Sequence, residues 1–292
     1  ADIDQVFAAE LSGFDRDEIR RWYNGYNWLG EHVYNPFDVL LLFREQKFSP
    51  YWFETATPTF LVKLLAERQL ATPELTALQT DIDLLGRFDV GDIGTEALLF
   101  QTGYLTIKKV EQPFPGIWTY TLGFPNYEVE TSLNKAMLPA LGIEARRVVQ
   151  QRMPLLRALS GNDFAALETH FKALFASIPY NWFTNNPIAQ YEGYYASVFY
   201  SHLAATGLTL IPEDVSHTGQ VDLAIDFDEQ IFLVEFKMVD DKASGEAMVQ
   251  LKEKDYAAKY QASGKPIFLI GVEFSKTERQ IVGFVWEGAK IE

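Results

Sequence analysis

Three charged residues stand in a stretch of chain that is otherwise mostly apolar. Asp222 lies in the segment 221–226, and Glu235 and Lys237 lie in the segment 230–237. Both segments alternate as β-strands do, so Glu235 and Lys237, two positions apart, point to the same face. Asp222 can reach that face from the neighbouring strand. The spacing therefore predicts two carboxylates and one ammonium group converging on one point.

Such a group of side chains suits the chemistry of phosphodiesters. Two carboxylates and water can hold a hard divalent cation such as Mg²⁺. The cation polarises a phosphodiester oxygen and helps to generate hydroxide, while a lysine beside it can orient the attacking water and offset negative charge. The alternative interpretation is an exposed ion pair, because Glu-x-Lys is common on strand surfaces. The apolar neighbours Val234 and Phe236 favour the site, since charges at the mouth of a buried strand are costly unless they coordinate something.

The composition of the chain excludes several kinds of site and several classes of protein. The 292 residues include no cysteine, which excludes disulfides, thiolate metal sites and a cysteine nucleophile. The four histidines show no H-x-x-x-H spacing, so a histidine-built zinc site is not expected. The net charge of −15 argues against a general nucleic-acid coat protein. No apolar run approaches the ~18–20 residues of a membrane span, and the N-terminus does not resemble a secretory signal, so we expect a cytoplasmic protein without membrane contact.

The second half of the chain predicts a mixed sheet with helices packed on it, an α/β (α+β mixed) class. The predicted order is helix, helix, three strands, helix, two strands, at residues 164–177, 189–205, 209–213, 221–226, 230–237, 244–262, 266–272 and 281–286.

The first half is helical with one hairpin. Asp15, with Glu18 three residues later, predicts the start of one helix. Asn35 predicts the start of a second helix, and Pro58 fits the first turn of a third. A further helix is expected at 95–102, strands at 103–109 and 118–122 around the loop 112–116, and a long helix or helix pair at 127–158. Helices followed by a hairpin suggest a winged-helix-like module. We place the domain boundary near 155–162, giving domains 1–158 and 159–292.

The motifs together resemble a known family. Residues 219–225 (GQVDLAI) and 231–237 (IFLVEFK) resemble the core of the PD-(D/E)XK nuclease superfamily, which implies a restriction-endonuclease-like fold. Residues 247–260 are similar to the Gln-containing helix of one branch, in which the nuclease domain follows an AAA-ATPase-like domain in bacterial proteins. Segments of the first half, among them 22–26 (WYNGY) and 34–37 (YNPF), resemble the end of that ATPase-like region.

The resemblance implies roles for individual residues. Asp222 and Glu235 would be the metal ligands for Mg²⁺ or Mn²⁺, and Lys237 the catalytic lysine. Glu192 matches the acidic position of the first core helix and would add a metal or water ligand; an exposed glutamate at a helix start is the other interpretation.

Two residues of the helix that follows the hairpin are candidate substrate-binding residues. Gln250 and Lys254, one turn apart, would share a face near the site, although both also fit an ordinary solvated face.

Two departures from the family pattern limit these expectations. Gln220 stands where relatives often carry Arg, which weakens a phosphate contact there. The sequence has no G-x-x-x-x-G-K-[ST] motif, and its only Gly-Lys pair, Gly264-Lys265, is followed by Pro266 and reads as a turn. We therefore expect no ATP binding, and we interpret the chain as beginning after the ATPase core.

Mg²⁺-dependent hydrolysis of DNA is the function we expect. Residues 180–292 carry 9 basic and 17 acidic residues, so DNA binding should be weak or assisted by a partner. One alternative is a non-enzymatic binding or assembly module with a vestigial site, which would dock a protein partner or a second copy through aromatic surface. Another is the nuclease of a defence or mobile-element system controlled by the missing ATPase part.

Overall fold

The structure is a computed structural model that describes residues 3–55, 59–68, 70–86, 94–178, 192–216 and 219–289. It divides into two compact units, residues 1–133 and 134–292, which are described separately below. The division lies earlier in the chain than the predicted boundary at 158. The physical reason is that α9 (Ala145–Ser160) packs on α10 (Phe164–Ala176) and so belongs to the second unit.

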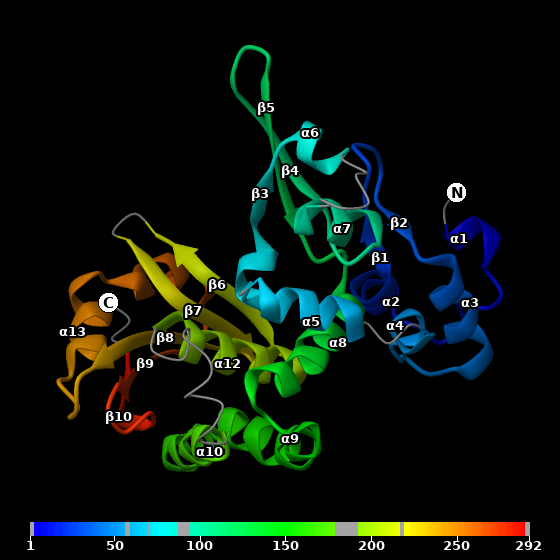
Figure 1. The fold of residues 1–292 in the computed structure, drawn as a ribbon. Coiled ribbons are helices and arrows are strands. Elements are labelled where there is room, and N and C mark those ends of the chain that lie inside the picture. Colours follow the sequence, from blue (N-terminus) through cyan, green and yellow to red (C-terminus); the bar gives the residue numbers. More distant parts are fainter. Residues whose placement is uncertain are drawn as a thin grey trace. The chain divides into compact units, whose positions relative to one another are not determined.

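Short helices form most of the first unit (Figure 1): α1 (Ile3–Val6), α2 (Arg16–Tyr23), α3 (Pro36–Glu45), α4 (Tyr51–Thr55), α5 (Thr59–Glu67), α6 (Ile82–Leu85), α7 (Thr95–Gln101) and the 3₁₀ turn η1 (Thr72–Thr76). The predicted starts at Asp15 and Asn35 are confirmed, since each side chain caps its helix by accepting a backbone N–H at 2.8 and 3.1 Å. Pro58 lies outside the described residues.

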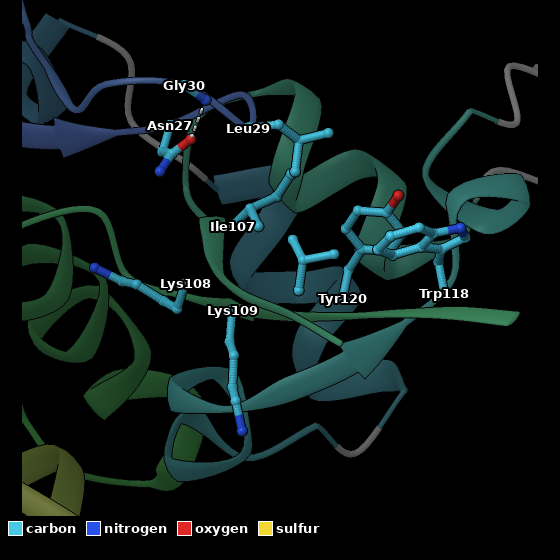
Figure 2. Close-up of a pocket in the computed structure, with 9 residues that line it drawn as sticks. Asn27, Leu29, Gly30, Ile107, Lys108, Lys109, Trp118 and Tyr120 are labelled. Carbon is cyan, nitrogen blue, oxygen red and sulfur yellow. Dashed lines mark hydrogen bonds between the residues drawn. The ribbon is translucent and has the colours of Figure 1, made fainter. Parts of the chain in front are cut away.

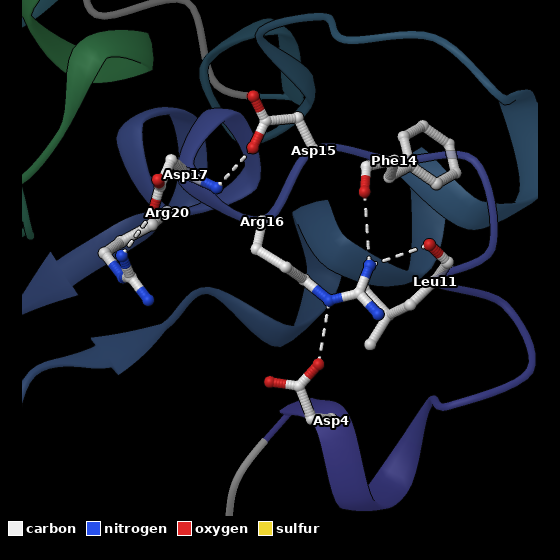
Figure 3. A network of polar contacts seen from close by, with 7 residues as sticks. All are labelled: Asp4, Leu11, Phe14, Asp15, Arg16, Asp17 and Arg20. Carbon is white, nitrogen blue, oxygen red and sulfur yellow. Dashed lines mark hydrogen bonds and ion pairs between the residues drawn. The ribbon is translucent and has the colours of Figure 1, made fainter.

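Arg16 ties the first two helices of this unit together. Its guanidinium pairs with Asp4 at 2.8 Å and donates to the carbonyl oxygens of Leu11 and Phe14 at 2.7 and 3.2 Å (Figure 3). The carbonyls belong to the turn between α1 and α2, in which the carbonyl oxygen of Leu11 also accepts the backbone N–H of Phe14 at 3.2 Å, so one side chain holds this turn to both helices.

The predicted hairpin is confirmed and is longer than predicted. β4 (Thr106–Phe114) and β5 (Ile117–Gly123) pair antiparallel, so the loop shrinks to Pro115 and Gly116. Gly116 has φ +83°, a left-handed conformation that glycine adopts without strain. A third strand, β3 (Leu78–Thr80), joins β5 on its other side, and β1 (Asn24–Tyr26) pairs with β2 (Val33–Tyr34).

Two buried carboxyl groups meet inside the first unit. Asp38 on α3 and Glu128 on α8 (Tyr127–Met137) are both fully buried. Glu128 accepts the backbone N–H of Phe53 at 3.1 Å. Burial raises the pKa of Glu128, and a hydrogen bond with Asp38 and the charge of that residue raise it further. The pair therefore retains a proton well above the usual range of a carboxyl group.

The second unit follows the predicted order of helices and strands. After the 3₁₀ turn η2 (Leu138–Leu141) come α9, α10, α12 (Glu192–Ala205), β6 (Thr209–Val215), β7 (Gln220–Phe227), β8 (Gln230–Val239), α13 (Glu246–Glu253), η4 (Tyr256–Ser263), β9 (Ile267–Ser275) and β10 (Ile281–Gly288). The prediction of one helix over 244–262 is wrong. The α-helix ends at Glu253, Asp255 takes a left-handed conformation at φ 45°, and the chain continues as a 3₁₀ helix.

The five strands form one mixed sheet in the order β10-β9-β8-β7-β6, in which β8 and β9 are parallel and the other pairs antiparallel. Helices α10 and α12 contribute to the core on one face, where Phe171 stacks on Phe199 at 3.8 Å. Helix α13 and η4 cover the other face through Met248, Leu251 and Tyr256. This arrangement confirms the predicted α/β class. No helix in the described ranges is both long and apolar enough to cross a membrane.

Candidate active site

The candidate site lies where the ladder between β7 and β8 ends. The last paired residues are Leu223 and Val234, so Asp222 and Glu235 follow directly on the two adjacent strands. Beyond that pair the Asp222 carboxylate accepts the backbone N–H of Phe236 at 2.7 Å. The Asp222 side chain therefore replaces a backbone carbonyl of β7 as the acceptor for this N–H group of β8. Both carboxylates lie on the same face of the sheet.

Glu235 is the central residue of the group, with 1% of its surface exposed. Its Oε1 accepts a hydrogen bond from the ammonium group of Lys237 at 3.1 Å and another from the amide of Gln250 on α13. The amide nitrogen of Gln250 also donates a hydrogen bond to the hydroxyl oxygen of Tyr256 at 3.4 Å. Oε2 of Glu235 is buried and accepts no hydrogen bond within the described part of the chain. Oε1 is thus held by two donors, and Oε2 keeps the capacity to accept a further hydrogen bond or a cation.

The electrostatics of the site come from its two carboxylates. Burial raises the pKa of Glu235 to about 7, and the negative charge of Asp222 acts in the same direction. The hydrogen bond from Lys237 and its positive charge lower that pKa in part. The shift is the expected result of placing two like charges and one opposite charge in a buried group, and such shifts cluster at functional sites.

A carboxylate that the sequence reasoning missed fixes the helix that carries Gln250. Glu273 on β9 is buried and accepts the backbone N–H groups of Ser244, Gly245 and Ala247 at 2.7, 3.0 and 3.3 Å. These are N–H groups at the start of α13, which have no partner inside the helix. Burial alone would raise the pKa of Glu273, but these hydrogen bonds outweigh burial and lower it. A lone carboxylate inside the apolar strand 267–274 was the signal that could have revealed it.

Gly271 lets α13 lie close to the sheet. A Cβ at this position would come within 2.8 Å of the backbone nitrogen of Met248. Since Gly271 is paired with Glu235 across the β8–β9 ladder, this close approach lies beside the site. Gly271 and Glu273 therefore set the position of the helix from which Gln250 reaches Glu235.

The structure brings together most of the predicted site residues. Asp222, Glu235, Lys237 and Gln250 gather at one end of the sheet face under α13. Lys254 is exposed and follows the last residue of that helix, and it is not among the residues that donate hydrogen bonds to Glu235. The backbone of Glu192 begins α12, as predicted within three residues, but its side chain lies outside the described part.

The oxygen atoms of the site fit a divalent cation that prefers oxygen ligands. Two carboxylates on one face and the orphaned Oε2 of Glu235 fit an oxygen-preferring ion such as Mg²⁺, which keeps several waters and needs one or two carboxylates. Within the described ranges no three His, Asp or Glu side chains are arranged to hold a metal ion. Asp222 and Glu235 are therefore a two-carboxylate set that water or a further ligand would complete.

Comparison with known proteins agrees with this geometry. The sequence model of the PD-(D/E)XK nuclease superfamily matches residues 190–284, which include all of β6 to β9 and α13. With its five-stranded mixed sheet flanked by helices, the second unit has a restriction-endonuclease-like fold. The match does not include the first half, so the resemblance of residues 1–158 to an AAA-ATPase-like region stays a prediction.

One curated relative matches nearly the whole chain. The protein called "Uncharacterized protein in vnfD 5'region" from Azotobacter chroococcum mcd 1 is 55% identical over 290 residues, which are 98% of this chain and 55% of the relative. The chain thus spans about half the length of that relative. No solved structure matches the chain significantly.

Proposed function

We propose that the second unit hydrolyses phosphodiester bonds of DNA in a reaction that requires Mg²⁺ or Mn²⁺. The observation that carries this proposal is the convergence of Asp222, Glu235 and Lys237 on one end of the sheet face, within the part of the chain that matches the nuclease superfamily. Two acidic groups with a lysine in contact form a set that suits hydrolysis of a phosphodiester.

The three residues would have different roles in the reaction. Asp222 and Glu235 would hold the divalent cation, which supplies polarisation of the scissile phosphate when bound. Lys237 lies at the mouth of the site with a quarter of its side chain exposed, so its ammonium group can reach both Glu235 and an incoming water. It would orient that water and offset the negative charge that develops on the phosphate. Gln250 would keep Glu235 in place by its hydrogen bond.

Glu192 and Lys254 have supporting roles in this proposal. Glu192 would add a ligand from the start of α12, and Lys254 would touch the DNA backbone from its exposed position. Gln220, at the first residue of β7, would give no phosphate contact.

A non-enzymatic binding module is the second candidate. It is favoured by the raised pKa of Glu235, about 7 without a bound cation, because a cation must then displace a proton that this carboxyl group holds more tightly than an ordinary glutamate does. In that case the second unit would keep the nuclease fold, but its site would no longer cleave phosphodiester bonds.

Residues 1–158 carry a separate proposal. Their resemblance to the end of an AAA-ATPase-like region suggests that a longer protein controls the nuclease through ATP, as in a defence or mobile-element system. The chain itself would not bind ATP. Calorimetry with ATP and Mg²⁺ tests this, and micromolar affinity would contradict it.

The nuclease proposal is tested with purified chain, supercoiled plasmid and linear oligonucleotides in Mg²⁺, Mn²⁺ or EDTA. We expect cleavage that EDTA abolishes and that Asp222→Ala lowers by about 10²–10³-fold. Asp240→Ala, an exposed carboxylate paired with Lys276, serves as the matched control and should cut normally. If the wild-type chain binds DNA and cuts none of these substrates with either metal, the binding module is the correct function.

A further inference from the structure

Helix α9 concentrates positive charge in a chain that is otherwise acidic. It holds four of the chain's 11 arginines, Arg146, Arg147, Arg152 and Arg157, and no acidic residue. The whole chain has a net charge of −15. The helix lies outside residues 190–284, which match the nuclease superfamily, and it contributes no residue to the candidate active site. The proposed hydrolysis therefore does not account for its charge.

One face of α9 is buried and the opposite face is basic. The buried residues lie in the core of the second unit, where α9 packs on α10 (Figure 1); they are Val148, Leu155, Ala158 and Leu159. At about 3.6 residues per turn, the row opposite to them consists of exposed residues, namely Arg146, Gln150, Met153 and Arg157. This basic row is about 16 Å long, at a rise of about 1.5 Å per residue. Arg147 and Arg152 are exposed on its two sides, so the charge of the helix faces solvent.

The acidic residues near the helix do not neutralise this charge. Glu144 approaches Arg147 only to 3.9 Å, and both side chains are about half exposed or more, so this pair contributes little. On α10, Glu168 pairs with Lys172 at 2.6 Å, and Asp163 caps that helix by accepting a backbone N–H at 2.9 Å. Within the described part of the chain, the other three arginines of α9 form no ion pair. Their guanidinium groups can therefore take a ligand.

The lysines beside the β4–β5 hairpin of the first unit differ in this respect. Figure 2 shows Lys108 and Lys109, which line a cleft next to this hairpin. The ammonium group of Lys108 donates to the carbonyl oxygen of Pro125 at 3.4 Å, and Lys109 pairs with Glu111 at 2.7 Å. Both lysines thus have a partner in the protein, whereas most of the arginines of α9 have none among the described residues.

Arginine rather than lysine provides all the charge of α9. The remainder of the chain contains 14 lysines and seven arginines, but the helix contains arginines alone. A guanidinium group presents a planar fork of N–H donors that matches the oxygens of a phosphate. Duplex DNA carries one negative charge per about 1.7 Å of its axis, so a row of about 16 Å meets several phosphates. The basic row therefore fits a polymer of phosphates better than a single anion.

We propose that the basic row of α9 binds double-stranded DNA through its phosphates, at a place separate from the candidate active site. Helix α9 packs on α10, on the sheet face opposite to the face that α13 covers. Its last residue, Ser160, bonds to Asp228 in the turn between β7 and β8, at the far end of these strands from Glu235. DNA held there would stay near the active site while another segment of the same molecule is cut. This inference rests on the proposed function, which makes DNA the polyanion.

Two other occupants fit the helix less well. A helix that lies on an anionic membrane inserts its apolar face into the lipid, but the apolar face of α9 is buried in the core. An acidic protein could contact Val149 and Met153, which are 64% and 54% exposed. The arginines favour DNA, because DNA supplies a phosphate at every point along the row whereas a protein would need carboxylates at matching positions.

The test measures binding of a fluorescein-labelled 20-base-pair DNA duplex to the full chain by fluorescence anisotropy in EDTA, where metal-dependent cleavage cannot occur. We expect the double variant Arg146→Gln/Arg157→Gln to bind at least about tenfold more weakly than wild type, as for the loss of hydrogen bonds to charged groups. Its salt slope should fall by about 1.8, since each lost phosphate contact lowers it by about 0.9. Arg146→Lys/Arg157→Lys should keep the salt slope and bind more weakly than wild type, because lysine retains the charge without the bidentate fork.

The matched control removes the same charge from the first unit. Arg20 and Arg44 are exposed arginines that pair with acidic neighbours, and Arg20→Gln/Arg44→Gln should bind the duplex as wild type does. The inference is wrong if wild type does not bind the duplex at about 50 mM salt, the low end of the usual range. It is equally wrong if the α9 glutamine variant binds as tightly as the control. The basic row would then belong to an acidic protein partner.

Cleavage rates keep this inference distinguishable from the proposed function. Asp222→Ala should bind the duplex as wild type does and lose cleavage. The α9 glutamine variant should raise KM and leave kcat unchanged, as expected when only binding is lost. A chain that binds DNA through α9 and cuts no substrate would refute the hydrolysis alone.

Discussion

Gln250 on α13 donates a hydrogen bond to the carboxylate of Glu235 on β8. The same oxygen accepts from Lys237, so a helix and a strand meet at one buried charge. Glu273 holds the start of that helix through backbone N–H groups. The geometry of the candidate site therefore depends on a helix as much as on the hairpin that carries the charged residues.

Replacing Gln250 should impair cleavage without unfolding the protein. Gln250→Ala removes one hydrogen bond to a charged group, which is worth about 1.5–3 kcal/mol, and we expect cleavage to slow by at least about tenfold. Val249→Ala is the matched control, because Val249 is the adjacent residue and is 51% exposed. Initial rates of oligonucleotide cleavage measure the effect. Equal rates for the two variants would show that the Gln250 contact does not matter.

A methyl group at Gly271 should displace α13. The added Cβ would meet the backbone nitrogen of Met248 at 2.8 Å, so we expect Gly271→Ala to cost about 1–3 kcal/mol of unfolding free energy. Gly193→Ala is the control, since its Cβ would meet no atom of the described residues within 4 Å. Urea unfolding measures both variants. A Gly271→Ala protein as stable as the control would mean that the helix can shift without cost.

The first unit should lose stability as the pH rises. The pKa of Glu128 is raised above its ordinary value of 4.5 by burial and by Asp38, so the folded protein keeps a proton that the unfolded chain releases. Stability is then fully present below pH 4.5 and falls as the pH climbs towards the raised pKa, by up to about 1.4 kcal/mol per pH unit. Glu128→Gln should remove the part of this dependence that lies above about pH 6, whereas Asp38, whose pKa burial raises to about 6, would still contribute below it.

Hydrogen exchange of residues 36–53 in the full chain reports on this unit locally. At pH 9 the amides of the wild-type protein should exchange faster than the base catalysis of exchange alone explains. The amides of Glu128→Gln should exchange at the rate that base catalysis explains. Glu54→Gln changes an exposed carboxylate on α4 and should behave as wild type. Identical profiles for wild type and Glu128→Gln would refute the retained proton.

Strand alternation predicted the central part of the site. The alternation of side chains in the two strands of residues 221–237 predicted that Asp222 and Glu235 lie on one face. The spacing of the hairpin predicted that they lie on adjacent strands. Local patterns suffice here because side chains in strands alternate with a period of two. The caps at Asp15 and Asn35 were equally predictable, since each depends on nearby residues alone.

Features set by tertiary packing could not be predicted in this way. The end of α13 before Asp255 and the anchoring of its start by Glu273 require knowledge of which strand lies beside the helix. The separation of the two units after residue 133 likewise reflects the packing of α9 on α10 rather than any local signal. The side chain of Glu192 stays a prediction, because it lies outside the described residues.

The central claim is that Lys237 acts on the attacking water beside Asp222 and Glu235. The most direct measurement compares single-turnover cleavage by wild type, Lys237→Ala and Lys254→Ala in Mg²⁺ or Mn²⁺. We predict that Lys237→Ala lowers the rate about 10²–10³-fold, while Lys254→Ala mainly weakens binding and reduces its salt slope by about one unit. Cleavage by Lys237→Ala at the wild-type rate would contradict the assignment of the site.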